Sequence, residues 1–175
     1  CDILDAVYSI KQKKTKRPYI MAGFPSHSIH KHLQKLMNHG ITVITIEQET
    51  HGESNPDRKV TGIYSPGTNI TYQKNYQSNW LCVISIETFN YLNSETIGIQ
   101  IGIAFTDLST GSTYLSESTS TKDDAHYSYD ETYRLLQIYQ PSEVVLYNKF
   151  PEQLSYETIV ENLDLHSIAT IHCKK

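Results

Sequence analysis

Apolar residues recur every three or four positions in one stretch near the start of the chain, which is the spacing of an amphipathic helix. The four positions of this stripe are Ile29, Leu33, Leu36 and Met37. Ser26 or Ser28 stands where a hydroxyl accepts an N–H at a helix start, and Gly40 stands where a left-handed C-terminal cap is expected. The pattern therefore predicts a helix over residues 29–39.

β-branched residues dominate the segments that follow this helix. Residues 41–47 predict a strand, and residues 60–64 predict a second, short strand that turn-forming residues end. Before the helix, residues 2–10 fit either a helix or a strand, and residues 21–25 contain Gly and Pro and indicate a turn. The first part of the chain thus predicts a small mixed α/β module.

The second half of the chain follows a polar, irregular stretch at 69–79, where we place the boundary between two modules. The predicted strands are 80–87, 97–107, 112–118, 143–147 and 167–173, and the predicted helices are 129–139 and 151–163. A hairpin turn at 108–111 joins the second and third strands. An antiparallel three-stranded meander followed by two helix–strand units gives a mixed sheet with helices on its faces, which is the ribonuclease H-like arrangement.

Both helices of this second module have predicted details that a structure can test. The buried side of helix 129–139 is expected to carry four residues, namely Tyr129, Tyr133, Leu136 and Tyr139. Pro141 is expected to end this helix, and Pro151 is expected at the first position of the next one.

Charge is unevenly distributed along the chain. Residues 1–72 hold nine Lys/Arg and six Asp/Glu, a net charge of +3, whereas residues 73–175 hold six and thirteen, a net charge of −7. Such a split indicates two modules with different partners. Five basic residues fall within seven positions: Lys11, Lys13, Lys14, Lys16 and Arg17. This basic cluster either holds phosphates through Coulomb attraction and counterion release or forms a solvated loop.

Histidines crowd the predicted helix without the usual partners of a metal site. His27 and His30 are three positions apart, but neither Cys nor Asp/Glu occurs between residues 6 and 46. A metal site needs ligands that converge on one point, usually with carboxylates that complete or orient it. We therefore expect no metal at this helix.

Carboxylates in the second half raise the alternative of a metal-dependent nuclease. Ribonuclease H-like nucleases hold two divalent ions between acids, and here Glu87 and Asp107 end neighbouring predicted strands. Antiparallel neighbours place these ends at opposite edges of a sheet, so we expect the two acids to lie far apart. Asp107 precedes Leu-Ser-Thr-Gly, where an Asp side chain braces a turn. No GxxxxGK followed by Ser or Thr and no GxGxxG occurs, so we expect no nucleotide hydrolysis in this stretch.

Three scattered cysteines and no CxxC pair favour a reducing, intracellular compartment over a disulfide framework. No apolar run approaches the roughly 18 residues of a membrane span, and no secretory signal opens the chain. Residue 1 is Cys rather than Met, so we expect the protein to continue upstream.

Several motifs in a fixed order resemble the MutS family of DNA mismatch-repair proteins. In the first half they are Met21-Ala22-Gly23-Phe24-Pro25-Ser26-His27, the helix with Gly40, the strand ending Glu47-Gln48, Arg58-Lys59-Val60 and Pro66-Gly67-Thr68. In the second half they are Asp107-Leu108-Ser109-Thr110-Gly111 and Pro141-Ser142-Glu143-Val144. The resemblance covers nearly the whole chain, and the form of the first motif, with Asn55-Pro56, is most similar to members from large DNA viruses and octocoral mitochondria.

The resemblance implies a DNA-binding and relay portion of a mismatch-repair ATPase. Residues 1–70 would be the later part of the mismatch-recognition domain, a mixed α/β module, and residues 76–175 would be the ribonuclease H-like connector. The implied DNA contacts are Lys11, Lys13, Lys14, Lys16, Arg17, Met21, Gly23, Phe24, Pro25, His27 and Arg58. The Phe-x-Glu pair that the family wedges into the minor groove would lie upstream of Cys1.

The resemblance also implies what belongs to the whole protein. This stretch is expected to hold no catalytic residue, metal or cofactor, whereas the whole protein would bind ATP and Mg and form a homodimer on duplex DNA with mismatches. A MutL-like partner would bind through the connector, and no membrane is implied. One departure is Gly62, where some bacterial members carry a second Arg, which removes one expected phosphate contact.

Overall fold

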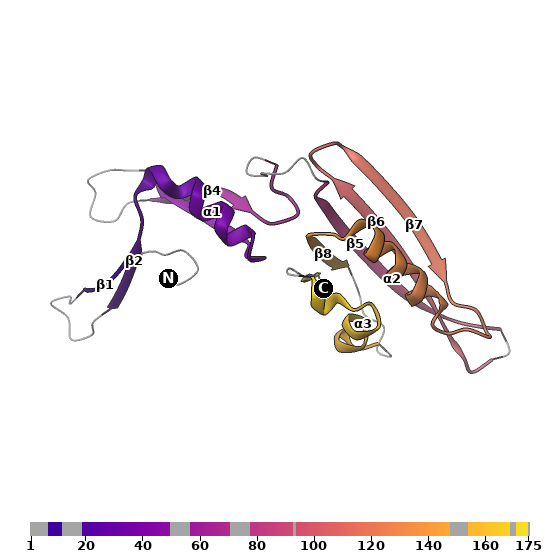
Figure 1. Ribbon diagram of the computed structural model, residues 1–175. Helices are drawn as coiled ribbons and strands as arrows, with labels where there is room; N and C mark the ends of the chain where they lie inside the picture. The colour runs from indigo at the N-terminus through magenta and orange to yellow at the C-terminus, as the bar shows by residue number, and fades with distance from the viewer. Residues whose placement is uncertain are drawn as a thin grey trace. The chain divides into compact units, whose positions relative to one another are not determined.

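The computed structural model describes residues 7–11, 19–49, 57–70, 78–92, 94–147, 154–168 and 171–174. The chain divides into two compact units, which carry separate sets of elements (Figure 1). The first unit comprises Cys1–Ser65 and Thr71–Lys74, and the second unit comprises Pro66–Ile70 and Asn75–Lys175.

The first unit is built from two antiparallel strand pairs and one helix. Its elements are β1 (Val7–Lys11), β2 (Tyr19–Gly23), a 3-10 turn at Ser26–Ser28, α1 (Ile29–Met37), β3 (Val43–Gln48) and β4 (Arg58–Tyr64). β1 pairs with β2, and β3 pairs with β4. Residues 7–10 of the segment 2–10, which fits either a helix or a strand by its pattern, belong to β1. The turn expected at residues 21–25 is wrong for residues 21–23, because they belong to β2.

The predicted helix forms because its apolar stripe packs inward. Leu33 and Met37 are buried, and Gly40 has a φ of 72°, the left-handed conformation expected after the helix. The predicted capping by serine is wrong. Ser28 occupies the N-cap position, but its Oγ donates a hydrogen bond of 2.8 Å to the Pro25 carbonyl instead of accepting one from the helix.

The second unit is a five-stranded mixed sheet with the predicted order of elements. They are β5 (Trp80–Asn90), β6 (Ile97–Asp107), β7 (Ser112–Thr119), α2 (Tyr127–Tyr139), β8 (Glu143–Tyr147), α3 (Tyr156–Asn162), a 3-10 turn at Leu165–Ser167 and β9 (Ile171–Lys174). The strand order is β7-β6-β5-β8-β9. β5, β6 and β7 are antiparallel neighbours, whereas β8 pairs in parallel with β5 and β9.

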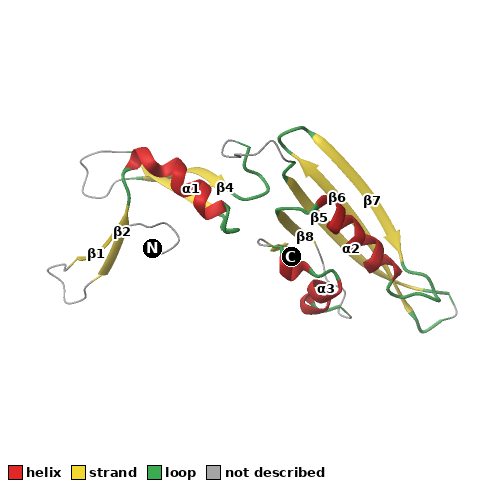
Figure 2. Ribbon diagram, in the orientation of Figure 1, coloured by secondary structure: helices red, strands yellow, loops and turns green. Residues whose placement is uncertain are grey.

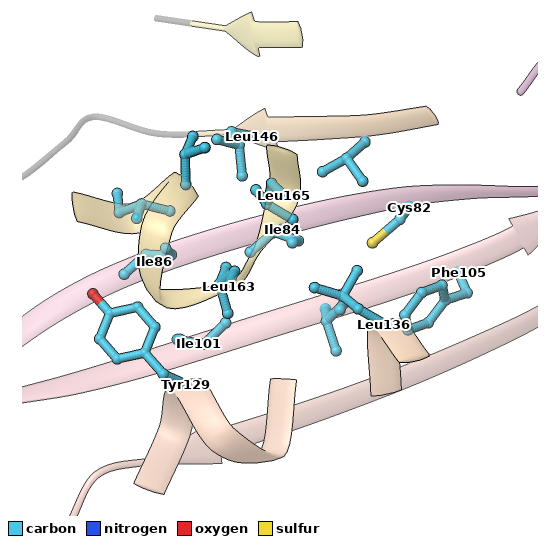
Figure 3. Close-up of a cluster of buried hydrophobic side chains, with 14 residues drawn as sticks. Cys82, Ile84, Ile86, Ile101, Phe105, Tyr129, Leu136, Leu146, Leu163 and Leu165 are labelled. Atoms are coloured by element: carbon cyan, nitrogen blue, oxygen red, sulfur yellow. The ribbon is translucent and has the colours of Figure 1, made fainter. Parts of the chain in front are cut away.

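One face of this sheet carries the core, because buried residues alternate along β5 and β6. Ile84 and Ile101 meet Leu136 of α2 and Leu163, which follows α3, in a single apolar cluster (Figure 3). Both helices therefore pack on the same face rather than on two (Figure 2). Burial raises the pKa of the Cys82 thiol within this core.

The buried side of α2 and the start of α3 differ from those predicted by the sequence pattern. On α2 the buried residues are Ser128, Tyr129, Thr132 and Leu136, while Tyr133 is exposed. Thr132 Oγ1 donates to the Ser128 carbonyl at 2.8 Å, which gives the buried Thr132 hydroxyl a partner. α3 begins at Tyr156, capped by Ser155, so the helix start predicted at Pro151 is too early by five residues, although Pro151 itself lies outside the described residues.

Candidate nucleic-acid interface

Two of the predicted DNA contacts, Lys11 and Gly23, lie at opposite ends of the β1–β2 pair. Lys11 ends β1 opposite Tyr19, whereas Gly23 ends β2 opposite Val7. Four residue steps separate these ends, which is about 14 Å at 3.4 Å per residue. The other cluster residues lie outside the described residues, in the segment that joins the strands: Lys13, Lys14, Lys16 and Arg17. The pair is thus about as long as four base-pair steps of duplex DNA.

The turn between β2 and α1 exposes four predicted contacts. They are Gly23, Phe24, Pro25 and His27, while Met21 is placed by its backbone within β2. The Ser28 N–H and Ser28 Oγ both donate to the Pro25 carbonyl, at 2.9 and 2.8 Å, and hold the turn tight. A Cβ added to Gly23 would meet nothing within 4 Å, so this backbone is open to close approach.

Phe24 is held against α1 by an aromatic contact that the sequence pattern does not reveal. Its ring centroid lies 4.1 Å from that of His32, with the planes tilted by 31°, and 38% of Phe24 remains exposed. The two residues are eight positions apart, and only the fold of the turn onto α1 brings them together. His32 therefore supports Phe24 in this turn, and the sequence motifs do not predict it as part of the site.

Arg58 begins β4 opposite Gln48, and its side chain is exposed. The partner strand β3 contacts α1, so the β3–β4 pair and the helix lie together in the first unit. At Gly62, a Cβ would lie 2.6 Å from the ring of Tyr64. The Tyr64 side chain therefore occupies the space into which a side chain at position 62 would extend.

Basic residues are concentrated on the first unit. Residues 7–46 hold seven Lys/Arg and no Asp/Glu, and Lys31 on α1 is exposed. Because this stretch contains no acid, its net charge is strongly positive. A positively charged segment attracts phosphates.

Glu87 and Asp107, the acids of the nuclease alternative, do not converge. Asp107 pairs with Trp80, whereas Glu87 pairs with Gln100, seven positions away along β6. That register separates them by about 24 Å at 3.4 Å per residue, far beyond the roughly 4 Å spacing of a two-metal site. Among the described residues, no group of three or more His, Cys, Asp or Glu is placed to hold a metal ion. No described helix is long and apolar enough to span a membrane.

Asp107 instead braces the turn between β6 and β7. Its Oδ1 accepts hydrogen bonds from the Ser109 N–H at 2.9 Å and from Ser109 Oγ at 2.6 Å, and the side chain is buried. The Ser109 hydroxyl is the main cause that lowers the pKa of Asp107, burial opposes it, and the Ser109 backbone and the Thr110 side chain and backbone add smaller lowering effects. Gly111 follows with a φ of 73° and closes the turn.

Two domain models of one protein family match the two halves of the chain. The model of MutS domain I matches residues 2–73, and the model of MutS domain II matches residues 90–171. The chain belongs to the MutS family. The expected kinship with mismatch-repair proteins is thereby confirmed.

Individual members of the MutS family agree with this assignment. A MutS homologue of Acanthamoeba polyphaga mimivirus is 31% identical over 90% of this chain and 14% of its own length. The DNA mismatch repair protein MutS of Petrotoga mobilis is 32% identical over 82% of this chain and 17% of its own. This chain therefore spans less than a fifth of these relatives. The family B DNA polymerase of Pyrobaculum calidifontis overlaps 78% of this chain and 18% of its own at a TM-score of 0.32 and 11% identity, too weak a likeness to carry an argument.

Proposed function

We propose that the first unit binds the sugar–phosphate backbone of duplex DNA and that the second unit relays between this unit and the rest of a mismatch-repair protein. The observation that carries the proposal is the acid-free stretch of residues 7–46, together with the exposed turn Gly23–His27. Membership of the MutS family supports it. Phosphate contacts position a protein on DNA without reading bases, so this unit by itself would have little mismatch preference.

The same proposal assigns the parts of the chain. Residues 1–70 act as the later part of the mismatch-recognition domain and residues 76–175 as the connector, and the eleven predicted contacts bind DNA. The whole protein would bind ATP and Mg, form a homodimer and engage a MutL-like partner through the connector. A nuclease activity of the second unit is not favoured, because Glu87 and Asp107 are seven positions apart in register.

The dependence of DNA affinity on salt tests this proposal. If about four phosphates are neutralised, the logarithm of the binding constant falls with the logarithm of salt concentration at a slope of roughly −3 to −4. Replacing Lys13, Lys14 and Lys16 together by Ala should flatten the slope by about one unit for each phosphate that is no longer neutralised. Fluorescence anisotropy titrations of labelled matched and mismatched duplexes at several salt concentrations provide the slope.

A matched control variant distinguishes the loss of the basic cluster from a general loss of positive charge. Lys122 and Arg134 are exposed basic residues of the second unit, and their double Ala variant should leave the slope unchanged. An unchanged slope in the triple variant would place DNA away from the basic cluster. A strong mismatch preference would contradict the assignment of this unit to backbone contacts.

A further inference from the structure

The two edges of the five-stranded sheet differ in how they are protected against pairing with another strand. In the order β7-β6-β5-β8-β9, the described sheet ends at β9 on one side and at β7 on the other. β9 is four residues long and ends on Lys174, and a short length and a Lys are both usual protections of an edge. β7 is eight residues long, contains no Pro, Lys or Arg, and keeps one unbroken register with β6. The edge at β7 therefore offers a regular strand for pairing.

One hydrogen bond shows which backbone groups of β7 point outward. The Ser120 N–H, directly after β7, donates to the Ile99 carbonyl of β6 at 2.8 Å. Because these directions alternate along an antiparallel ladder, the N–H and C=O groups of Thr113, Leu115 and Glu117 point away from β6. They lie on the side of β7 where no described strand is paired with it. The edge thus presents three residues whose donors and acceptors can bond a further strand.

An apolar row on the sheet face opposite α2 and α3 ends at the same edge. Val145, Val83 and Ala104 stand opposite one another on neighbouring strands, and Leu115 on β7 is the next residue in register. Leu115 is 73% exposed, because β7 is the last described strand on this side of the sheet. A strand added beyond β7 would give the Leu115 side chain a neighbour and would continue the row.

The side chains of β7 fit a second copy of the same strand. In an antiparallel pair centred on Leu115, this residue would meet its own copy, and Thr113 would stand opposite Glu117 of the second copy. The two Glu117 residues would be four residue steps apart, about 14 Å, so their repulsion would be largely screened. A pair centred one residue later would oppose Leu115 with Glu117, and a pair centred one residue earlier would reach the turn at Gly111. The register centred on Leu115 is therefore favoured.

We propose that the β7 strands of two copies of this chain pair in this register through about six backbone hydrogen bonds. A strand pair over residues 112–118 buries less than the roughly 1,200 Å² of a stable interface, so we expect a dissociation constant of about 0.1 mM. The contact uses only the second unit and requires neither DNA nor ATP. It is therefore separate from the homodimer proposed for the whole protein, and its failure would leave the DNA-binding proposal intact.

Sedimentation velocity of the whole chain without DNA, at concentrations from well below to well above this dissociation constant, measures the association. Leu115→Lys should weaken it about 10-fold, because two like charges would meet at the centre of the interface. Leu92→Lys is the matched control, since Leu92 is 85% exposed and lies between β5 and β6, and it should leave the association unchanged. The fluorescence of Trp80 checks that each variant is folded.

A strengthening variant tests the register and cannot be mimicked by a loss of folding. Thr113→Lys would face Glu117 of the second copy at two symmetric places and should tighten the association roughly 3–10-fold. Thr119→Lys adds the same charge outside the paired segment and should not tighten it. Three results would each overturn the proposal: a chain that stays monomeric at the highest concentration, Leu115→Lys associating as tightly as the wild type, or Thr113→Lys associating no more tightly than Thr119→Lys.

Discussion

The second unit buries a contiguous apolar core, whereas the first exposes much of its apolar surface. Fourteen buried residues from the sheet, the two helices and the turn that follows α3 form the core of the second unit. Among the described residues of the first unit, the buried hydrophobic side chains are Leu33 and Met37. One face of the β3–β4 pair carries Ile44, Ile46, Val60 and Ile63, each between 52% and 65% exposed.

This contrast fits the functions that we propose for the two units. A relay element needs a shape that persists, and burial of apolar side chains supplies that persistence. A basic surface needs access to phosphates, which requires exposed side chains and an open backbone such as that at Gly23. The two units therefore differ in what a substitution should do to them.

A core truncation in the second unit should have the largest effect. Phe105 is fully buried and stacks on Tyr139 with ring centroids 4.4 Å apart. Phe105→Ala should lower the free energy of unfolding of this unit by about 3–5 kcal/mol. Urea unfolding followed by the fluorescence of Trp80, the single tryptophan, measures it.

Leu33→Ala provides the comparison in the first unit. It should leave the Trp80 transition in place, because Leu33 belongs to the other unit. A loss below about 1 kcal/mol in Phe105→Ala would contradict the packing described for the second unit.

Removal of the turn brace should have an intermediate effect that depends on pH. Asp107→Ala loses both hydrogen bonds from Ser109 and should cost about 1–2 kcal/mol at neutral pH, while Asp107→Asn keeps an acceptor and should cost less. The folded pKa of Asp107 is below the ordinary value of about 3.9, so its charge stabilises the fold above that pH.

The stabilising contribution of this charge should fade as the pH falls from about 4 through the folded pKa. The difference in unfolding free energy between the wild type and Asp107→Asn, measured in urea from pH 7 to pH 2.5, should therefore shrink on the acid side. A difference that grows with acidity would contradict the assigned direction of the pKa.

A substitution on the exposed face of the first unit should have the smallest effect. Ile63 is 65% exposed opposite Ile44 on the β3–β4 pair. Ile63→Thr retains the β-branched shape and should change the unfolding free energy by no more than about 0.5 kcal/mol. A circular-dichroism melt compares it with the wild type. A loss of several kcal/mol would show that this face is covered.

The sequence predicts the order of elements well where one periodicity dominates. β6 and β8 match the expected ranges, and the hairpin turn at Leu108–Gly111 lies where the Asp-Leu-Ser-Thr-Gly motif placed it. These segments are buried or tightly turned, so local pattern and tertiary packing agree. The same agreement places α1 and its Gly40 cap.

Pattern reasoning falls short where tertiary contacts override it. Residues 21–23 join β2 because β1 supplies a pairing partner, which the Gly and Pro nearby conceal. Thr132, rather than the predicted Tyr133, lies on the buried side of α2. Its hydroxyl can enter the core because it donates a hydrogen bond to the Ser128 carbonyl. Glu143 looks like a surface residue before an apolar strand, and its burial is explained by the distant Gly67 and His172, which contact its two carboxylate oxygens.

The location of DNA on the chain tests the central claim most directly. Hydrogen–deuterium exchange followed by mass spectrometry, with and without an excess of a duplex of about 20 base pairs at low salt, reads both units in one experiment. We expect slower exchange in peptides that cover residues 7–35 and no change in peptides that cover β5, β6 and β7. Slower exchange over β5–β7 with an unaffected first unit would contradict the assignment of DNA binding to the basic unit.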